Sequence, residues 1–184
     1  MPEAKNITIL GAGQWGTSLA MLAARNGCKV CLYDHEEARV ELMTRERENK
    51  RYLSGFPFPE GITLTSDLKT AFANRVVMPI IPSKVYREFA RKFASFVTPE
   101  HILVHGTKGL ESGSHKRMSQ ILIEETGTKL IGALSGPNLA IEIAQQQPAA
   151  TVVASPHDEV IAELQRLLAS SQLRIYGNHD LTGV

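Results

Sequence analysis

The sequence has little that would attract a polyanion or a lipid bilayer. Its 20 Lys and Arg residues nearly balance its 19 Asp and Glu residues, so the formal net charge over 184 residues is +1. No long-range basic field is available to draw in nucleic acid, and any bound anion must be held locally. Apolar runs such as 102–104 are far shorter than the roughly 20 residues that a membrane-spanning helix needs. We therefore expect no nucleic-acid partner and no membrane span.

Cysteine is also scarce. Cys28 and Cys31 form a C-x-x-C pattern, which is found in redox dithiols and in zinc sites. The stretch 29–33 predicts a buried strand, on which side chains three apart point to opposite faces, and no second pair supplies further zinc ligands. His101 and His105 have no acidic or cysteine partner nearby in the sequence. We expect core cysteines, ordinary strand-end histidines and no metal site.

The chain has no linker, repeat or biased segment long enough to divide it. Its composition, with 43% apolar and 21% charged residues, is that of a globular protein. We therefore expect one domain over residues 1–184. A strand-like run begins almost at once, with no basic leader and no small-residue cleavage site before it, so we expect a cytoplasmic protein.

Apolar stretches typical of strands alternate with helical patterns along the chain. Strands are expected at 6–10, 29–33, 76–81, 101–105, 130–134, 151–154 and 173–176, and helices at 13–26, 36–49, about 85–96, 115–126, 138–145 and about 160–168. Strands separated by helices imply parallel pairing through right-handed crossovers. The sequence predicts a doubly wound, Rossmann-like α/β fold with a mostly parallel sheet and helices on both faces. Ligands of such sheets bind beyond the carboxyl ends of the strands.

Pro79 does not fit this pattern. It lies within the apolar run 76–81, and proline cannot donate a hydrogen bond to a sheet ladder. Its position predicts that this strand is an edge strand, is bulged or is destabilised.

A glycine-rich turn follows the first predicted strand. Residues 11–16 read Gly-Ala-Gly-Gln-Trp-Gly and match G-x-G-x-x-G between a strand and a helix. Gly11 permits the tight turn, Gly13 lets a pyrophosphate approach the backbone, and Gly16 lets helix and strand pack closely. The free amides at the start of the helix supply an anion site without any lysine. The segment therefore predicts a site for a dinucleotide.

Four other residues are candidates for contact with that dinucleotide. Asp34 follows the second strand, where a carboxylate accepts hydrogen bonds from the adenosine ribose; a solvated strand-end aspartate is the alternative. His35 is placed to face the adenine or, when protonated, a 2′-phosphate. Gln14 and Trp15 lie in the turn itself, although a tryptophan on a first helix is also typical of the core.

Five segments of the chain match, in order and spacing, the motifs of one enzyme family. They are G-A-G-Q-W-G-T-S-L-A at 11–20, Y-L-S-G at 52–55, I-P-S at 81–83, T-K-G-L-E at 107–111 and L-S-G-P-N-L-A-I-E at 134–142. Together they resemble the bacterial-type NAD(P)-dependent glycerol-3-phosphate dehydrogenases. Gln14, where a small residue is common, and Ser54, in place of a proline, depart from the family pattern.

The resemblance implies a hydride exchange between NAD or NADP and sn-glycerol 3-phosphate, which gives glycerone phosphate and serves glycerophospholipid synthesis. It also implies tolerance of both cofactors. The carboxylate of Asp34 would repel a 2′-phosphate, whereas His35 favours one, so we expect use of both cofactors with NAD preferred. Lys108 matches an active-site lysine that touches both substrate and nicotinamide, whereas a surface lysine is the alternative. Gly136 and Asn138 match substrate-side positions. Ala140 matches a cofactor contact, whereas helix packing is its alternative.

The end of the chain resembles the segment that leads into E-x-G-G-A-x-K-N, whose lysine is the family's general acid/base. The resemblance implies that this residue lies beyond Val184, together with an all-helical substrate domain through which a homodimer would form. We expect no catalytic residue within the chain. A dinucleotide-sensing module without catalysis and a related dehydrogenase for an acyl or sugar substrate remain alternatives. Lys108 and the segment 135–137 favour the oxidoreductase, since a sensor needs no substrate-side residues.

Overall fold

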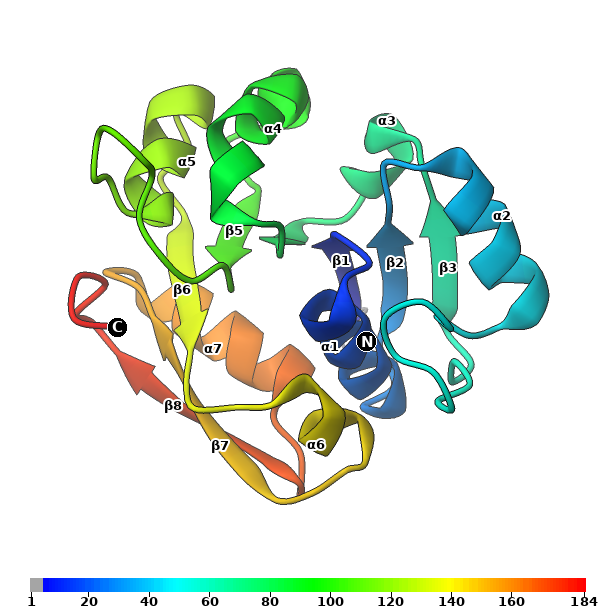
Figure 1. Cartoon of the computed structure of the whole chain (residues 1–184). Helices are drawn as coiled ribbons and strands as arrows, with labels where there is room; N and C mark the ends of the chain where they lie inside the picture. Colours follow the sequence, from blue (N-terminus) through cyan, green and yellow to red (C-terminus); the bar gives the residue numbers. More distant parts are fainter. Residues whose placement is uncertain (1–4) are drawn as a thin grey trace.

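The computed structural model describes residues 5–184, which form one eight-stranded sheet with helices packed against both faces (Figure 1). The strands follow the spatial order β3-β2-β1-β4-β5-β6-β7-β8. Their bounds are β1 (Asn6–Leu10), β2 (Lys29–Tyr33), β3 (Ile62–Thr65), β4 (Val76–Pro79), β5 (Ile102–His105), β6 (Ile131–Ser135), β7 (Ala149–Ala154) and β8 (Leu173–Asn178). The predicted Rossmann-like α/β fold with a mostly parallel sheet is confirmed.

Helices form most of the connections between the strands. The α-helices are α1 (Gln14–Arg25), α2 (Glu37–Glu46), α3 (Leu68–Ala71), α4 (Tyr86–Phe93), α5 (Met118–Thr126), α6 (Ala140–Ala144) and α7 (Asp158–Leu168), and the 3-10 helices are η1 (Ser83–Val85) and η2 (Ala94–Phe96). On α4, Tyr86, Ala90 and Phe93 are buried at the spacing of one helix face. Figure 1 shows α4 and α5 side by side.

The core is divided by the sheet into two clusters. Ile7 and Ile9 of β1 pack into one cluster with residues of α1, α6 and α7, whereas Leu10 packs into the other with residues of α4 and α5. This follows from the two-residue side-chain period of a strand. Cys28 and Cys31 are both free and buried, one in each cluster, which confirms their expected place in the core.

The structure also contains elements that the sequence analysis did not anticipate. β3 and the short α3 follow the loop that joins α2 to the sheet, and β3 pairs in parallel with β2. Two helices are shorter than expected because single residues adopt left-handed backbone conformations. Arg47, with φ 54°, ends α2, and His115, with φ 56°, lies before the start of α5.

The sheet is mostly parallel, as predicted, and the exception is the pair formed by β6 and β7, which runs antiparallel. The α-helix in the connection between them is the five-residue α6, which spans about 7.5 Å. β6 itself has five residues and is about 17 Å long. The helix alone therefore does not span the length of β6, unlike the crossover helix usual between parallel strands. β8 pairs in parallel with β7, so both final strands oppose the direction of the others.

Pro79 is the last residue of β4, and the interpretation of this strand as an edge strand is wrong. β4 lies between β1 and β5. On the β1 side the ladder continues, because Ile80 N donates to Leu10 O at 2.8 Å. Pairing with β5 ends two residues earlier, at Val77. On the β5 side Pro79 O still accepts from Gly106 N at 3.4 Å, so the amide hydrogen that proline lacks costs the ladder at most one bond at its end.

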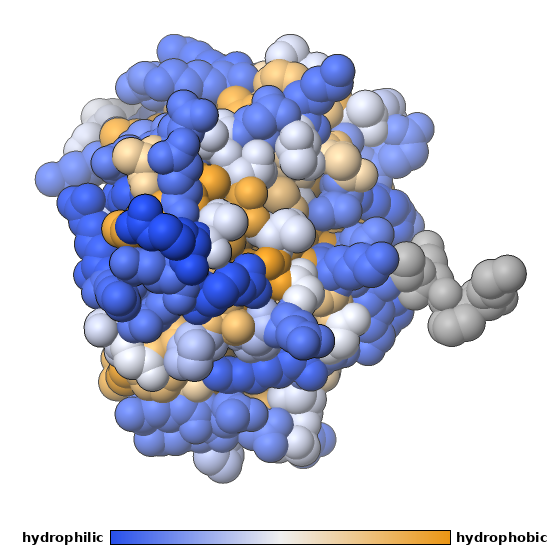
Figure 2. Space-filling model, turned by 90° about the vertical axis from the view of Figure 1, so that its right-hand side faces the viewer, coloured by the Kyte–Doolittle hydropathy of each residue, from blue (hydrophilic) through white to orange (hydrophobic). Residues whose placement is uncertain are grey.

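Figure 2 views the molecule from the side on which α2 and β3 lie. Hydrophilic residues cover most of this face, and apolar residues gather toward its centre. α2 contributes to this character because it buries only Met43. None of the helices in residues 5–184 combines the length and the apolar character that a membrane span requires.

His105 at the end of β5 gives the fold a pH dependence. Its ring lies edge-on to Tyr86, with centroids 6.4 Å apart, and burial lowers the pKa of the imidazole from 6.5 to about 4, with the charge of Arg117 acting in the same direction. The unfolded chain therefore binds a proton that the folded chain does not accept between these two values.

We expect the free energy of unfolding to fall as the pH is lowered from about 6.5 to about 4, with at most about 1.4 kcal/mol per pH unit from this one proton. His105→Gln should remove that part of the slope in urea unfolding. His35→Gln is the control, since the His35 side chain is 75% exposed. An unchanged slope in His105→Gln would contradict the assignment.

Candidate functional site

The turn between β1 and α1 has the geometry expected of the glycine motif. Gly11 has φ +115°, and a Cβ there would collide with the carbonyl oxygen of Ile80. A Cβ on Gly16 would collide with the carbonyl oxygen of Gly11. A Cβ on Gly13 would meet nothing within 4 Å, so this backbone is open to a ligand. Gly11 and Gly16 therefore permit close packing, and Gly13 leaves the backbone accessible to a ligand.

The first turn of α1 is suited to bind an anion. Gly13 is the N-cap, no side chain caps the turn, and no acidic residue lies in it. The first amides of a helix have no partner within the helix, and the helix dipole places positive charge there. A phosphate or pyrophosphate therefore fits at this end of α1.

A cleft of about 670 Å³ opens beside this turn. It is formed by the turns that follow β1, β4, β5 and β6. The predicted site residues that line it are Gly13, Gln14, Trp15, Gly16, Lys108, Gly136, Asn138 and Ala140. The fold thus brings the candidate cofactor residues and the candidate substrate residues into one hollow. Trp15 also packs against the first core cluster, which confirms its interpretation as a core residue, whereas its contact with a dinucleotide stays a prediction.

Lys108 lies on the connection after β5, and its Nζ donates to the carbonyl oxygen of Gly136 at 3.3 Å. Gly136 has no room for a side chain, since a Cβ would lie 2.8 Å from Asn138 Oδ1 and 2.9 Å from Thr151 Oγ1. Asn138 Nδ2 donates to Ala150 O at 2.8 Å, whereas its Oδ1 is buried without a hydrogen-bond partner in the described part of the chain. The ammonium is thus placed at the cleft against the β6 turn.

Ala140 begins α6, and its carbonyl accepts a hydrogen bond of 2.8 Å from Ser18 Oγ on α1. α6 is further tied to α1 by Arg25, which donates to Ala144 O at 3.0 Å. The two helices that border the cleft are therefore fixed to each other by side-chain donors. The sequence analysis did not anticipate these contacts: Ser18 lies in the 11–20 motif but had no role assigned to it, and Arg25 belongs to none of the five matched segments.

Asp34 and His35 lie at the end of β2, outside this cleft. Asp34 is buried, and its Oδ1 accepts from Arg39 Nη2 at 2.5 Å, from Arg39 Nε at 3.2 Å and from Glu36 N at 2.9 Å. The guanidinium of Arg39 also lies over the ring of Tyr52, 5.8 Å from its centroid. The strand-end carboxylate is therefore already paired with a cation, which the sequence analysis missed. The only sequence signal is a basic residue five positions further on.

Asn49 was also missed, although it holds the glycine turn. This side chain is buried, and its Nδ2 donates to Ala12 O and to Thr17 Oγ1, both at 2.8 Å. Asn49 Oδ1 accepts from Tyr52 N at 3.3 Å. One amide therefore connects the turn, α1 and the 52–55 segment. A single buried asparagine produces no periodicity that would reveal this role.

No group of three or more His, Cys, Asp or Glu side chains within residues 5–184 is arranged to hold a metal ion. The candidate chemistry of the site therefore depends on backbone amides, Lys108 and the polar groups of the strand-end turns.

The order of the strands and the glycine turn between β1 and α1 define a Rossmann-like protein of the doubly wound class. Residues 6–161 match the profile described as the N-terminus of NAD-dependent glycerol-3-phosphate dehydrogenase. The chain belongs to this family.

Relatives and solved structures agree with this assignment. A glycerol-3-phosphate dehydrogenase (NAD(P)+) of Teredinibacter turnerae is 41% identical over 185 residues, which cover 100% of this chain and 54% of the relative. The crystal structure of glycerol-3-phosphate dehydrogenase from Coxiella burnetii superimposes with a TM-score of 0.93 at 34% identity, over 99% of this chain and 56% of that one. This chain thus spans about half the length of these proteins.

More distant structures share the fold alone. A UDP-D-ManNAc dehydrogenase from Pyrococcus horikoshii superimposes with a TM-score of 0.73 at 12% identity, over 96% of this chain and 48% of that one. The architecture is therefore common to proteins with different substrates, and the site must carry any argument about substrate.

We expect Asn49→Ala to lower the free energy of unfolding by about 1–3 kcal/mol, because it leaves buried acceptors at Ala12 and Thr17 without a donor. Amide hydrogen exchange in residues 11–17 should accelerate. Asn26→Ala is the control, since Asn26 ties the other end of α1 to Leu167 O. Unchanged exchange in the turn of Asn49→Ala would contradict this role.

Proposed function

We propose that this chain is the coenzyme-binding part of an NAD(P)-dependent glycerol-3-phosphate dehydrogenase, which interconverts sn-glycerol 3-phosphate and glycerone phosphate. The observation that carries the proposal is the single cleft that joins the glycine turn to Lys108, Gly136 and Asn138. A sensing module would need the first part of that cleft only. Family membership and the names of the relatives support the same activity.

The residues of the site fit a dinucleotide. The open backbone at Gly13 and the uncapped start of α1 would hold the pyrophosphate. The adenosine end would lie toward β2, and the nicotinamide end toward the turns of β4, β5 and β6. When bound, the nicotinamide supplies or accepts the hydride. Lys108 would hold the substrate oxygen on which charge develops, and its ammonium suits such a point contact.

The cleft has few titratable side chains. Lys84 and Lys108 are the ones that line it within residues 5–184. The motif E-x-G-G-A-x-K-N, whose lysine is the general acid/base that the resemblance implies, is not among the segments of this chain. We therefore propose that the general acid/base comes from a segment outside this chain, in the half that the longer relatives possess.

That half would also provide the all-helical substrate domain and the contacts of a homodimer. We further propose a cytoplasmic location, where free thiols such as those of Cys28 and Cys31 persist. Glycerol 3-phosphate formed there would serve glycerophospholipid synthesis.

We expect the purified 184-residue chain to bind NADH in a fluorescence titration but to oxidise it very slowly with glycerone phosphate. The missing acid/base group alone accounts for about 10²–10⁴-fold in rate. In the presence of NADH, glycerone phosphate should give saturation-transfer NMR signals that Lys108→Met abolishes and Lys84→Met retains. Rapid turnover by this chain would place the acid/base group within it. Signals that persist in Lys108→Met would remove the substrate role of Lys108.

Cofactor choice depends on the pair formed by Asp34 and Arg39. A free carboxylate at this place favours NAD through the ribose hydroxyls, whereas a nearby arginine accommodates the 2′-phosphate of NADP. In this chain the carboxylate of Asp34 and the guanidinium of Arg39 are in direct contact. We therefore propose that the chain uses both cofactors, with NAD preferred.

We expect Arg39→Ala to weaken NADPH binding by about tenfold or more, and NADH binding much less, because a charge-assisted hydrogen bond to the 2′-phosphate is lost. Asp34→Ala should weaken NADH binding relative to NADPH. Arg45→Ala is the matched control on α2, since the Arg45 side chain is 74% exposed and its ion pair within residues 5–184 is with Glu46. If neither Asp34→Ala nor Arg39→Ala changes either affinity, this pair has no part in cofactor binding.

A further inference from the structure

The connection between β5 and α5 must hold Lys108 at the cleft although it contains little regular structure. An isolated antiparallel bridge joins Leu110 to Arg117, and Leu110 itself is exposed. Lysine has a long flexible stem, so its position depends on how firmly the backbone on each side of it is held. Two anchors flank Lys108 in sequence, one at Thr107 and the other at Glu111.

The first anchor joins the connection to the end of β4. Thr107 Oγ1 donates to Ile81 O at 2.8 Å and accepts from Ile81 N at 3.3 Å. This pair of hydrogen bonds fixes the residue directly before Lys108. It does not reach the residues that follow Lys108.

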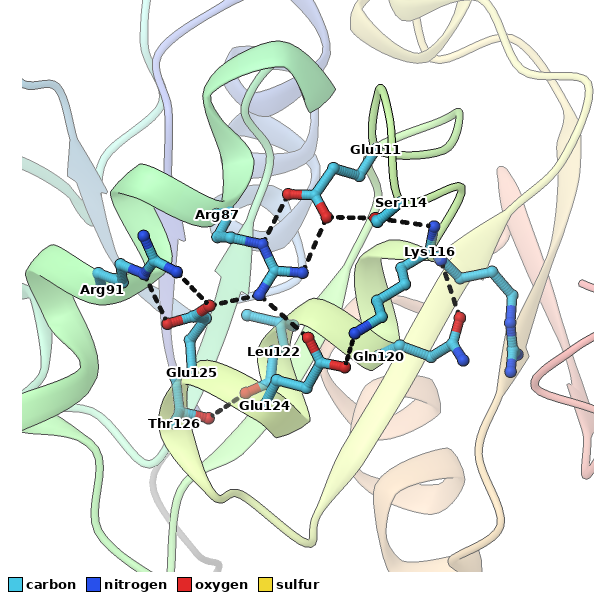
Figure 3. Close-up of polar contacts among 11 residues, drawn as sticks. Arg87, Arg91, Glu111, Ser114, Lys116, Gln120, Leu122, Glu124, Glu125 and Thr126 are labelled. Carbon is cyan, nitrogen blue, oxygen red and sulfur yellow. Dashed lines mark hydrogen bonds and ion pairs between the residues drawn. The ribbon is translucent and has the colours of Figure 1, made fainter.

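The second anchor is a bidentate ion pair between Glu111 and Arg87 of α4 (Figure 3). Arg87 Nε lies 2.6 Å from Glu111 Oε1, and Arg87 Nη2 lies 2.8 Å from Oε2. The two side chains are only 21% and 19% exposed. Bidentate pairs of this kind combine strength with a fixed geometry. Arg87 also lowers the pKa of Glu111 to about 2, so the carboxylate stays charged at any ordinary pH.

Arg87 is itself fixed by α5. Its Nη1 lies 3.0 Å from Glu124 Oε2 and also pairs with Glu125. Arg91, one turn further along α4, contacts Glu125 but not the connection. Figure 3 shows Arg87 at the centre of this network, between the carboxylates of α5 and the carboxylate of Glu111. The network therefore has an inner part that reaches the connection and an outer part that only joins α4 to α5.

We propose that Arg87 and Glu111 are positioning residues that hold the Lys108 backbone at the cleft; this inference rests on the proposed substrate role of Lys108. Glu111 lies three residues after Lys108, so the pair acts through the chain, and neither Arg87 nor Glu111 is among the residues that line the cleft. If the network served only to join α4 to α5, loss of Arg91 would affect Lys108 as much as loss of Arg87. If Arg87 and Glu111 position Lys108, loss of Arg91 leaves Lys108 unaffected.

The test measures how fast Lys108 reacts with pyridoxal 5′-phosphate, a phosphate-bearing aldehyde, in the NADH-loaded 184-residue chain. The amine condenses with the aldehyde and releases water, and borohydride then reduces the imine so that each lysine can be quantified by peptide mass spectrometry. The concentration dependence separates the binding of the reagent from the limiting rate at Lys108. Lys84, which lines the same cleft on η1, is the internal reference.

We expect Arg87→Gln and Glu111→Gln each to lower the limiting rate at Lys108 by about tenfold or more, since small misplacements have effects of this size. The double variant should be no worse than either single variant, because the residues act as a unit. The NADH affinity and the rate at Lys84 should not change. Arg91→Gln is the matched control and should leave Lys108 at the wild-type rate.

Two results would overturn the inference: an unchanged limiting rate at Lys108 in Glu111→Gln, or an equal loss in Arg91→Gln. Glu111→Gln keeps the contacts between Arg87 and α5, so it provides a test even if Arg87→Gln does not fold. The proposed function is tested separately, by protection of wild-type Lys108 with glycerone phosphate. Absence of protection would count against the proposed function. The comparison of the variants would still show whether Arg87 and Glu111 position Lys108.

Discussion

The whole site depends on how closely the first helix approaches the centre of the sheet. Gly16 lies so near the carbonyl of Gly11, and Gly11 so near the carbonyl of Ile80, that neither position has room for a Cβ. This packing brings the uncapped amides of α1 to the carboxyl ends of β1 and β4. A chain with a net charge of +1 can thus bind a doubly charged pyrophosphate with backbone groups. Asn49 then holds the turn from outside, through Ala12 and Thr17.

Charged side chains complete the site by fixing backbone rather than by forming a broad field. Arg39 neutralises Asp34 after β2, and Arg87 binds three carboxylates, one of them on the connection that carries Lys108. Each arginine uses several of its donors at once, which is the geometry that lysine cannot reproduce. The ammonium of Lys108, in contrast, makes one hydrogen bond of 3.3 Å to a carbonyl within the described residues. Arginines with several partners thus lie around the site, and a lysine with a single hydrogen bond faces the cleft.

The sequence predicted those parts of the structure that follow from local rules. It did not predict the parts that depend on contacts between side chains distant in the chain. Apolar periodicity predicted seven of the eight strands, and the glycine spacing predicted the turn. A mostly parallel sheet was predicted, but the place of the antiparallel pair was not, because the end of α6 could not be located from the residues alone. Arg39, Asn49 and Arg87 were missed for another reason: their partners lie on other elements, and no pattern along the chain records such contacts.

The proline at the end of β4 has a consequence for the shape of the sheet. Pro79 has no amide hydrogen to donate toward β5, and the main-chain hydrogen bond that follows between the ends of the two strands, from Gly106 N to Pro79 O, is 3.4 Å long. Pairing with β1 continues, since Ile80 N donates to Leu10 O at 2.8 Å. Beyond Pro79 the hydroxyl of Thr107 binds both the amide and the carbonyl of Ile81. Ile80 and Thr107 both line the cleft, so a side chain replaces the main-chain ladder between β4 and β5 where the cleft begins.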